Sequence, residues 1–283
     1  MTDGMTDPLQ EDDALAEIFS VLALEAGAAI MRVLADGPCA RIKSDSSPVC
    51  DADLLAEQII LDGLARRAPA YPVVAEELCA SGNIPKLDGG PFYLVDPLDG
   101  TREFLEARDC FSVNIALIRD GVPAASAVFA PARGELYLAG SRAWGCAALP
   151  GTKAPTRSRW RELRARPMPE RDAIALASRS HRDAETDRFL SRLPVSEVVP
   201  IGSSLKFCML AAGKADVYPR FGPTMEWDTA AGDAVLRRAG GVVLDLSGAP
   251  EAYGKTGRKF ANGPFIAWGD RAAAARYMAS EVR

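Results

Sequence analysis

The residues best suited to chemistry are two carboxylates in the run Asp96-Pro97-Leu98-Asp99-Gly100-Thr101, which directly follows the apolar segment 92–95. Proline stiffens such a turn, and glycine lets its backbone approach a ligand closely. Asp96, the Leu98 carbonyl and Asp99 can therefore face one hard cation, and oxygen ligands of this kind suit Mg²⁺. The same residue types also build ordinary turns, so this run alone leaves both interpretations open.

Acidic residues at two other places could complete such a site. Glu76-Glu77 follows the apolar run Val73-Val74-Ala75, and Asp228 stands where a helix is expected to begin. Phosphate chemistry with two Mg²⁺ ions about 3.5–4 Å apart needs several converging carboxylates. Taken singly, solvated loop acids and a helix N-cap are the simpler interpretations of these residues.

Composition excludes several other chemistries. The chain of 283 residues has 33 basic and 38 acidic residues, so its net charge of -5 provides no general basic field for nucleic acid. His181 is the only histidine, which excludes two-histidine zinc sites and HExxH helices. The six cysteines are at least eleven residues apart, so CxxC spacing is absent as well.

The first half of the chain contains the elements that must position the acidic turn. Apolar side chains recur every three or four residues over 9–35 and predict an amphipathic helix, and a second helix is expected over Asp51–Arg67. Short extended runs follow at 71–75, 92–95, 111–119, 124–130 and 135–139. This pattern predicts a largely antiparallel sheet behind two helices.

In the second half, strands and helices alternate, as in α/β layers. The segment 150–169, rich in proline, arginine, serine and threonine, is the expected boundary, so we divide the chain into residues 1–155 and 156–283. Strands are expected at 173–178, 195–200 and 242–246, and helices at 183–192, 204–212 and 228–239.

The order of these motifs resembles the inositol monophosphatase superfamily of Mg²⁺-dependent, lithium-sensitive phosphatases. The acidic pair comes first, then D-P-L-D-G-T, then W-D-T-A-A-G at 227–232. The resemblance runs from Lys43 to Gly241, and segments 96–104, 202–207 and 218–223 look like the CysQ-type 3′(2′),5′-bisphosphate nucleotidases. It implies an α+β or α/β fold with two subdomains in an α-β-α-β-α layered sandwich.

The resemblance also implies roles for individual residues. Two or three Mg²⁺ ions would be held by Glu76, Asp96, Leu98, Asp99 and Asp228. Asp53 and Thr101 would be the catalytic pair that orients or deprotonates the attacking water. Substrate contacts would come from Glu76, Leu98, Asp99, Gly100, Thr101, His181, Ser203, Lys206, Arg220 and Asp228. Lys43 and Glu57 fall at family positions with supporting or structural roles, and Cys50 replaces the threonine of the family's V-T-x-x-D pattern.

Charge suggests the substrate class. The second dianion of a bisphosphate must meet fixed cations or helix termini outside the metal site, and Lys206, Arg220 and the pair Ser203-Ser204 are candidates. An ordinary cap and surface cations are the simpler alternative. The resemblance to the CysQ-type nucleotidases implies the specific reaction, hydrolysis of the 3′-phosphate of adenosine 3′,5′-bisphosphate to give AMP and phosphate.

Other assignments stay open at this point. The same motifs fit an inositol-1-phosphate or fructose-1,6-bisphosphate phosphatase, and a non-catalytic nucleotide-binding module is a further alternative.

The acidic start, Met1 to Asp13, lacks the pattern of a secretory signal, and Glu17, Glu25 and Arg32 argue against a membrane span in the first helix. We therefore expect a cytoplasmic protein without a transmembrane segment. Peripheral association with the cytoplasmic side of the inner membrane, and the choice between monomer and homodimer, stay open.

Overall fold

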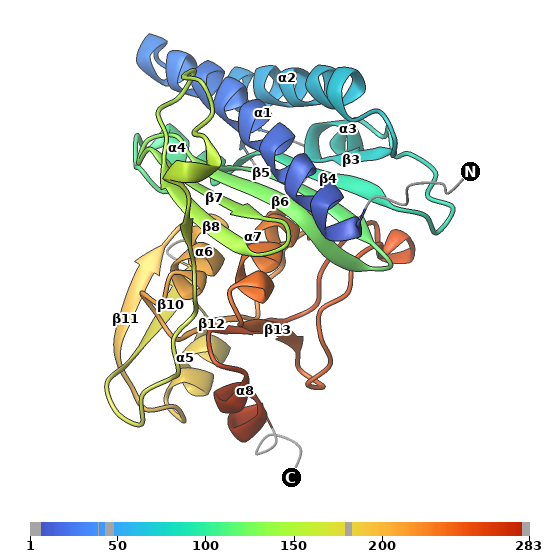
Figure 1. Cartoon of the computed structure of the whole chain (residues 1–283). Coiled ribbons are helices and arrows are strands. Elements are labelled where there is room, and N and C mark those ends of the chain that lie inside the picture. Colours follow the sequence, from blue (N-terminus) through green and yellow to red (C-terminus); the bar gives the residue numbers. More distant parts are fainter. Residues whose placement is uncertain (1–6, 39, 43–47, 179–182, 279–283) are drawn as a thin grey trace, which may run out of the picture.

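Five layers of secondary structure make up the protein in the computed structural model, which describes residues 7–38, 40–42, 48–178 and 183–278. Figure 1 shows helices α1 and α2 over a first sheet, helices α6 and α7 beneath it, then a second sheet, with α5 and α8 on the outer side. The expected α-β-α-β-α layered sandwich is confirmed.

The outer helices α1 (Pro8–Asp36) and α2 (Asp51–Arg67) match their expected ranges closely. The Asp7 side chain caps α1 by accepting the Leu9 N–H at 3.1 Å, and Pro8 suits the first turn. The two helices pack against each other and against the first sheet. A Cβ at Gly63 would lie 2.1 Å from Leu22 Cδ2, so glycine allows this close approach.

By length and composition alone, α1 could cross a membrane, and its charged residues do not exclude this. In the folded chain, half of its apolar window is buried inside the protein. Its apolar face packs on β5, β6 and β7. Core packing therefore accounts for the apolar character of this helix.

The first sheet has seven strands in chain order, and all neighbours except the parallel pair β3 and β4 are antiparallel. Its strands are β3 (Val73–Ala75), β4 (Phe92–Asp99), β5 (Ser112–Arg119), β6 (Val122–Ala130), β7 (Glu135–Ala139), β8 (Ala143–Ala147) and β9 (Arg161–Glu162). Two differences from the sequence prediction matter here. Strand β4 continues through the acidic motif instead of ending at Val95, and β9, with the short helix Arg157–Arg159, lies in the segment expected to be a boundary loop.

The second sheet has the order β11-β10-β12-β14-β13, with parallel pairing around β10 and antiparallel pairing around β14. Its strands are β10 (Ala173–Ser178), β11 (Val195–Ile201), β12 (Val217–Arg220), β13 (Val242–Asp245) and β14 (Phe265–Trp268). The helices of this half are α5 (Ala184–Leu190), α6 (Leu205–Ala211), α7 (Glu226–Arg238) and α8 (Arg271–Met278). A short hairpin, β1 (Ala40–Ile42) with β2 (Pro48–Cys50), leads into α2.

Helix α7 joins the two halves of the molecule. It comes from the second half of the chain, yet it packs on β4, β5, β6 and β7 of the first sheet and on β13 of the second. Ser126 on β6 donates a hydrogen bond of 2.9 Å to the Ala231 carbonyl on this helix. The division into residues 1–155 and 156–283 therefore stays a proposal about chain order, while the core runs through both parts.

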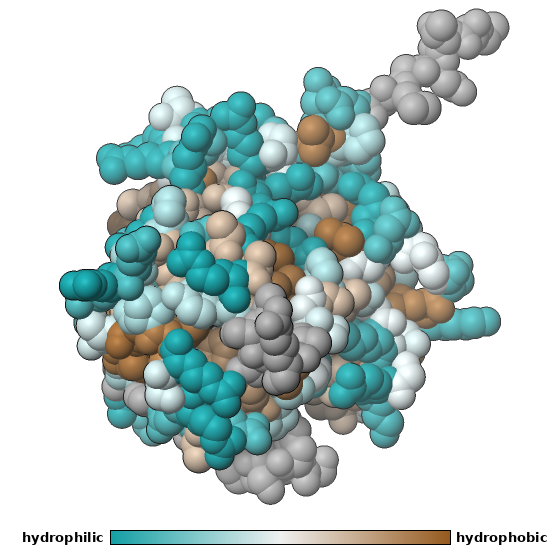
Figure 2. All heavy atoms as spheres, turned by 90° about the horizontal axis from the view of Figure 1, so that it is seen from below, coloured by the Kyte–Doolittle hydropathy of each residue, from teal (hydrophilic) through white to brown (hydrophobic). Residues whose placement is uncertain are grey.

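Large hydrophobic side chains on the surface are spread along the chain. Those that are exposed are Leu9, Leu54, Leu55, Ile84, Val122, Leu149 and Leu246. On the face shown in Figure 2, hydrophilic side chains surround separate hydrophobic patches. Such scattered apolar residues are usual on globular proteins.

Candidate active site

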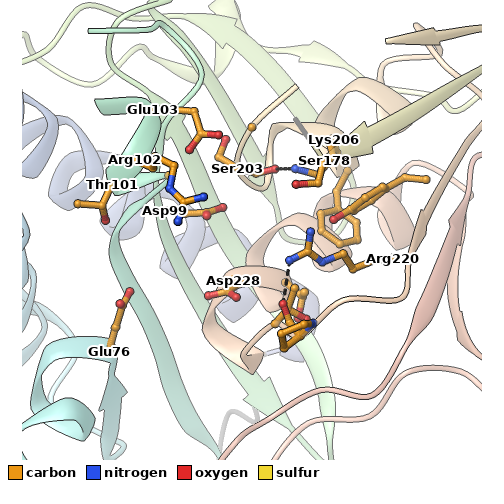
Figure 3. A pocket seen from close by; sticks show the side chains of 17 residues that line it. Glu76, Asp99, Thr101, Arg102, Glu103, Ser178, Ser203, Lys206, Arg220 and Asp228 are labelled. Carbon is orange, nitrogen blue, oxygen red and sulfur yellow. Dashed lines mark hydrogen bonds between the residues drawn. The ribbon is translucent and has the colours of Figure 1, made fainter. Parts of the chain in front are cut away.

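A cleft of about 260 Å³ lies between the two sheets and collects most of the residues singled out in the sequence. Figure 3 shows acidic side chains from α3, β4 and α7 on one side of it, and Ser203, Lys206 and Arg220 on the other. Its lining residues include Glu76, Asp99, Gly100, Thr101, Ser203, Lys206, Arg220 and Asp228. Elements far apart in the sequence therefore meet in one pocket.

The acidic motif is shaped by an irregularity at the end of β4. Asp96 pairs with Asn114 and Asp99 with Ser112, so the register shifts between the two carboxylates. Gly100 then has a φ of 92°, and a Cβ there would lie 3.2 Å from the Cys110 carbonyl oxygen. Glycine permits this left-handed turn, which starts the short helix α4 (Thr101–Leu105).

Each of the three aspartates accepts a backbone N–H with one carboxylate oxygen. Asp96 Oδ1 accepts from Leu98 at 3.0 Å, and Asp99 Oδ2 accepts from Ser204 at 2.5 Å. Asp228 Oδ2 accepts from Met225 at 2.8 Å. The expectation that Asp228 is a helix N-cap is wrong, because Met225 is the N-cap of α7 (Glu226–Arg238). Asp228 stands at the third helical position, where its carboxylate accepts the N–H of the N-cap residue, and it also lines the cleft. One oxygen of each carboxylate is fixed, so the other is the one that could bind a cation.

The electrostatics of these acids favour a bound cation. Burial, and then the negative charges of Glu76, Asp99 and Asp228, raise the pKa of Asp96 well above its usual value. Burial also raises the pKa of Asp228 well above its usual value, and that of Asp99 to about 6, although Lys206 opposes the latter shift. Oxygen-only, mutually repelling donors of this kind fit Mg²⁺.

Glu76, Asp99 and Asp228 line the cleft. Asp96 and Leu98 are buried and are not among its lining residues. Among the residues that the structure describes, no three His, Cys, Asp or Glu side chains already form a compact metal-binding group. Like-charged carboxylates repel one another, and a cation bound between them would relieve this repulsion. The donor types and their convergence on one cleft fit the hypothesis of a metal site.

The expected pair Asp53 and Thr101 is in contact. Thr101 Oγ1 lies 3.1 Å from Asp53 Oδ1 and 3.2 Å from the Leu98 carbonyl oxygen. The other oxygen of Asp53 accepts from the Cys50 N–H at 2.8 Å and from the Cys50 thiol at 2.9 Å. Cys50 is buried, and burial followed by the hydrogen bond to Asp53 raises the pKa of its thiol to about 12. The cysteine therefore keeps its proton and acts as a donor at the family's threonine position.

The acidic pair does not lie in a loop. Glu76 and Glu77 open the short helix α3 (Glu76–Ala80), with Glu76 facing the cleft and Glu77 buried. The buried carboxylate of Glu57 accepts the Glu77 N–H at 2.8 Å. Glu57 thereby ties α2 to the start of α3, which agrees with the supporting role expected for it.

Lys206 and Arg220, expected on the surface in the simpler alternative, are both buried. Lys206 Nζ donates to the carbonyl oxygens of Ser203 at 2.6 Å and Ile201 at 3.3 Å, and lies 5.0 Å from the centre of the Tyr218 ring. Arg220 donates through Nε to Gly222 and through Nη2 to Pro223, at 3.1 and 2.8 Å. Both cations are held by the protein's own carbonyls at the edge of the cleft.

The expectation that Ser203 and Ser204 both offer free groups to a phosphate is wrong for Ser204. Its N–H is donated to Asp99, and its hydroxyl lies 2.6 Å from Asn114 Oδ1 and 3.0 Å from Ser112 Oγ. Ser203 lines the cleft and has a φ of 54°, a strained conformation for a non-glycine residue. The Lys206 ammonium, bonded to the Ser203 carbonyl, helps to hold that turn.

Sequence patterns missed several residues of the cleft, among them Arg102, Glu103 and Ser178. Arg102 and Glu103 directly follow the glycine and threonine of the motif, and this adjacency was the available signal. Ser178 ends β10, a position that only the tertiary fold brings to the cleft. His181 and Lys43, both singled out in the sequence, lie outside the described residues.

Comparison with known proteins decides the family. The sequence model described as the inositol monophosphatase family matches residues 11–281. The chain belongs to the inositol monophosphatase family. Within it, the 3′(2′),5′-bisphosphate nucleotidase CysQ of Shigella flexneri is 43% identical over 236 residues, 82% of this chain and 91% of that protein. The nucleotidase CysQ of Buchnera aphidicola is 36% identical over 87% of this chain and 90% of its own length.

Solved structures of this family share the layered fold. A crystal structure of CysQ from Bacteroides thetaiotaomicron has a TM-score of 0.75 at 34% identity, covering 92% of this chain and 97% of that one. The inositol monophosphatase from Anabaena (Nostoc) sp. PCC 7120 has a TM-score of 0.71 at 24% identity, with coverage of 95% and 96%. The second likeness shows the common fold alone.

Proposed function

We propose that this chain is an Mg²⁺-dependent phosphatase that hydrolyses the 3′-phosphate of adenosine 3′,5′-bisphosphate, giving AMP and phosphate. The names of the relatives support the broader statement that the chain is a phosphatase acting on bisphosphate nucleotides. The observation that carries the finer proposal is one cleft with half-buried acids on one side and buried cations on the other. Such a site can take a phosphate at each side.

The acidic side would hold the metal. Hard oxygen donors for two or three Mg²⁺ ions would come from Glu76, Asp96, Asp99, Asp228 and the Leu98 carbonyl. Mg²⁺ bound there would supply Lewis-acid chemistry, making water more acidic and neutralising phosphate charge. The pKa values of Asp96, Asp99 and Asp228 are raised by burial, so these groups gain most from such neutralisation.

Asp53 and Thr101 would prepare the attacking water. When Thr101 Oγ1 donates to Asp53 Oδ1, 3.1 Å away, its lone pairs can accept a hydrogen bond from water. As the water attacks, Oγ1 can take its proton while passing its own to Asp53 Oδ1. Cys50 fixes the other oxygen of Asp53 and so keeps Oδ1 turned toward the threonine.

The other side of the cleft would receive the second phosphate. Ser203, Lys206 and Arg220 lie there, and the two cations attract a dianion whichever group contacts it directly. Backbone and side-chain groups of Gly100 and Thr101 would touch the phosphate that is cleaved. A contact between His181 and the base stays a prediction.

A phosphate-release assay tests this function. We expect adenosine 3′,5′-bisphosphate to be preferred over inositol-1-phosphate and fructose-1,6-bisphosphate, with activity lost in EDTA, restored by Mg²⁺ and inhibited by lithium. Preference for either competing substrate would replace the proposed substrate. Binding of the bisphosphate without any phosphate release would instead indicate a nucleotide-binding module.

The location and assembly of the protein also stay predictions. A cytoplasmic location, with or without peripheral contact to the inner membrane, can be tested by cell fractionation. Size-exclusion chromatography with light scattering would distinguish monomer from homodimer.

A further inference from the structure

The cleft contains a third cation that differs from Lys206 and Arg220. Arg102 lines the cleft from the first turn of α4, and its side chain is exposed. Figure 3 shows it directed into the pocket near Asp99. Lys206 and Arg220 are buried and bonded to carbonyl oxygens, whereas no described residue anchors Arg102 in this way.

The surroundings of Arg102 explain why it is available. An arginine on a helix can pair with an acid four residues later, and here that position is Glu106. Glu106 is instead bonded to Arg108, with Oε2 2.6 Å from Nε. In the part of the chain that the structure describes, the Arg102 side chain makes no hydrogen bond or ion pair. Its five N–H donors are therefore free to meet a ligand.

The buried cations alone leave the binding of a second phosphate incomplete. Lys206 has already given two of its three N–H donors to Ser203 and Ile201. Arg220 is held in place by Gly222 and Pro223 and cannot follow the substrate. A phosphate dianion needs several donors, and a guanidinium fork can supply two of them at once.

We propose that Arg102 is a specificity-determining residue that binds the second phosphate of the substrate, the one that is not cleaved. This inference rests on the proposed function, because a second phosphate exists only in a bisphosphate substrate. The buried pair supplies a fixed positive field, and Arg102 supplies the adjustable direct contact from the opposite side of the cleft. Because the contact is exposed, salt screens it.

The experiment compares Arg102→Gln with wild type on two substrates, adenosine 3′,5′-bisphosphate and adenosine 3′-monophosphate. Both carry the same cleavable group, and only the first has a 5′-phosphate. We expect kcat/KM for the bisphosphate to fall about ten- to a hundredfold, as for the loss of one or two charge-assisted hydrogen bonds. The kcat/KM for the monophosphate should change less than about threefold, which is within the contribution of an exposed ion pair. Arg102→Lys should be intermediate, because it keeps the charge and loses the fork.

Arg142→Gln is the matched control, since it removes an exposed arginine that pairs with Glu162 and does not line the cleft. This control should leave kcat/KM unchanged for both substrates. Raising the salt concentration should shrink the wild-type preference for the bisphosphate more than that of Arg102→Gln.

The outcomes separate this inference from the function it rests on. If wild type does not hydrolyse the bisphosphate, the proposed function fails before any variant is tested. If wild type does, equal losses on both substrates would show that Arg102 serves the cleaved phosphate, and no loss would show that it is not a contact. Either result overturns the inference and leaves the proposed function standing. A Tm for each variant within a few degrees of wild type shows that misfolding does not cause the loss of activity. Arg102→Lys provides a second, milder substitution.

Discussion

The two sides of the cleft are built on opposite electrostatic principles. On the acidic side, Asp96, Asp99 and Asp228 each accept one backbone N–H, and burial together with neighbouring acids raises their pKa values. On the cationic side, Lys206 and Arg220 are surrounded by carbonyl oxygens of their own loops. On the acidic side, the carboxylates therefore repel one another until a cation binds. On the cationic side, hydrogen bonds to carbonyl oxygens already balance the two charges.

This difference indicates how each side would respond to change. Removing a charge from the acidic side should lower turnover and raise the stability of the fold, because a repulsive group is lost. Removing a charge from the cationic side should lower both turnover and stability, because carbonyl oxygens lose their hydrogen-bond partners. Variants on the two sides can therefore separate function from stability.

Asp96→Asn should have the largest effect. Turnover should fall by at least about a hundredfold, since a proposed metal ligand and its charge are lost. In EDTA at pH 7 the Tm of this variant should rise by about 2–4 °C, the shift that about 1 kcal/mol produces in a chain of this size. The amide oxygen of the new side chain can still accept the Leu98 N–H, so geometry is preserved. Full activity in the folded variant would rule out a metal role for Asp96.

Asp233→Asn is the control for this variant, because Asp233 is equally buried but already paired. It accepts from Arg237 Nε at 2.7 Å and Tyr253 OH at 2.9 Å. Breaking a buried pair costs about 3–5 kcal/mol, so its Tm should fall while activity per folded molecule stays. A Tm drop in both variants would contradict the stored repulsion on the acidic side.

Thr101→Ala should lower kcat by about a hundredfold with little change in KM, because the hydroxyl acts on the attacking water. Thr101→Ser keeps a hydroxyl and should restore most of the activity. Mg²⁺ affinity, measured by calorimetry, should stay the same. A rise in KM alone would make Thr101 a phosphate contact and remove the proposed pair with Asp53.

The cationic side should be sensitive to pH. Burial lowers the pKa of Lys206 to about 8, so the side chain is charged below that pH and loses its charge as the pH rises through it. The ratio of kcat/KM for bisphosphate over 3′-monophosphate should therefore fall about tenfold by one pH unit above this pKa. Taking the ratio cancels groups common to both substrates. In Lys206→Arg, which keeps its charge, the fall in this ratio should move to higher pH. A wild-type ratio that stays constant between about pH 7 and 9.5 would show that the charge of Lys206 does not contribute to binding of the second phosphate.

Cys50→Ala should have the smallest effect. Asp53 Oδ2 would lose the thiol at 2.9 Å and keep the backbone N–H at 2.8 Å, so about fivefold in kcat is expected, as for one hydrogen bond of about 1 kcal/mol. Cys50→Ser and Cys50→Thr keep a donor and should be close to wild type. Cys146→Ala, in β8, is the control for loss of a thiol. A loss in the serine variant equal to that in alanine would show that cavity formation, not the donor, is responsible.

Local patterns were enough to predict several elements of this fold. The three-and-four spacing in α1 and the acidic first turn of α2 predicted both helices to within a residue or two. The apolar run before Asp96 correctly predicted a buried strand, but not that the strand continues to Asp99. The continuation depends on pairing with β5, a partner that no local pattern reveals.

Other elements had no local signal. Strands β12 and β14 are four residues long, and their hydrogen bonds to each other join residues about fifty positions apart. Helix α8, rich in alanine, was missed for the same reason: its apolar side becomes evident only against β14. Short elements are specified by their neighbours more than by their own residues.

The candidate site shows the same division. The residue types and their order in the chain determined which acids could bind a hard cation, because carboxylate chemistry and the turn at Gly100 are local properties. Only the tertiary structure decided that Ser204 supports Asp99, that Lys206 and Arg220 are anchored, and that Arg102 is free of partners among the described residues. Hydrogen-bond partners and burial depend on which distant segments the fold brings together, and packing sets them across the whole chain.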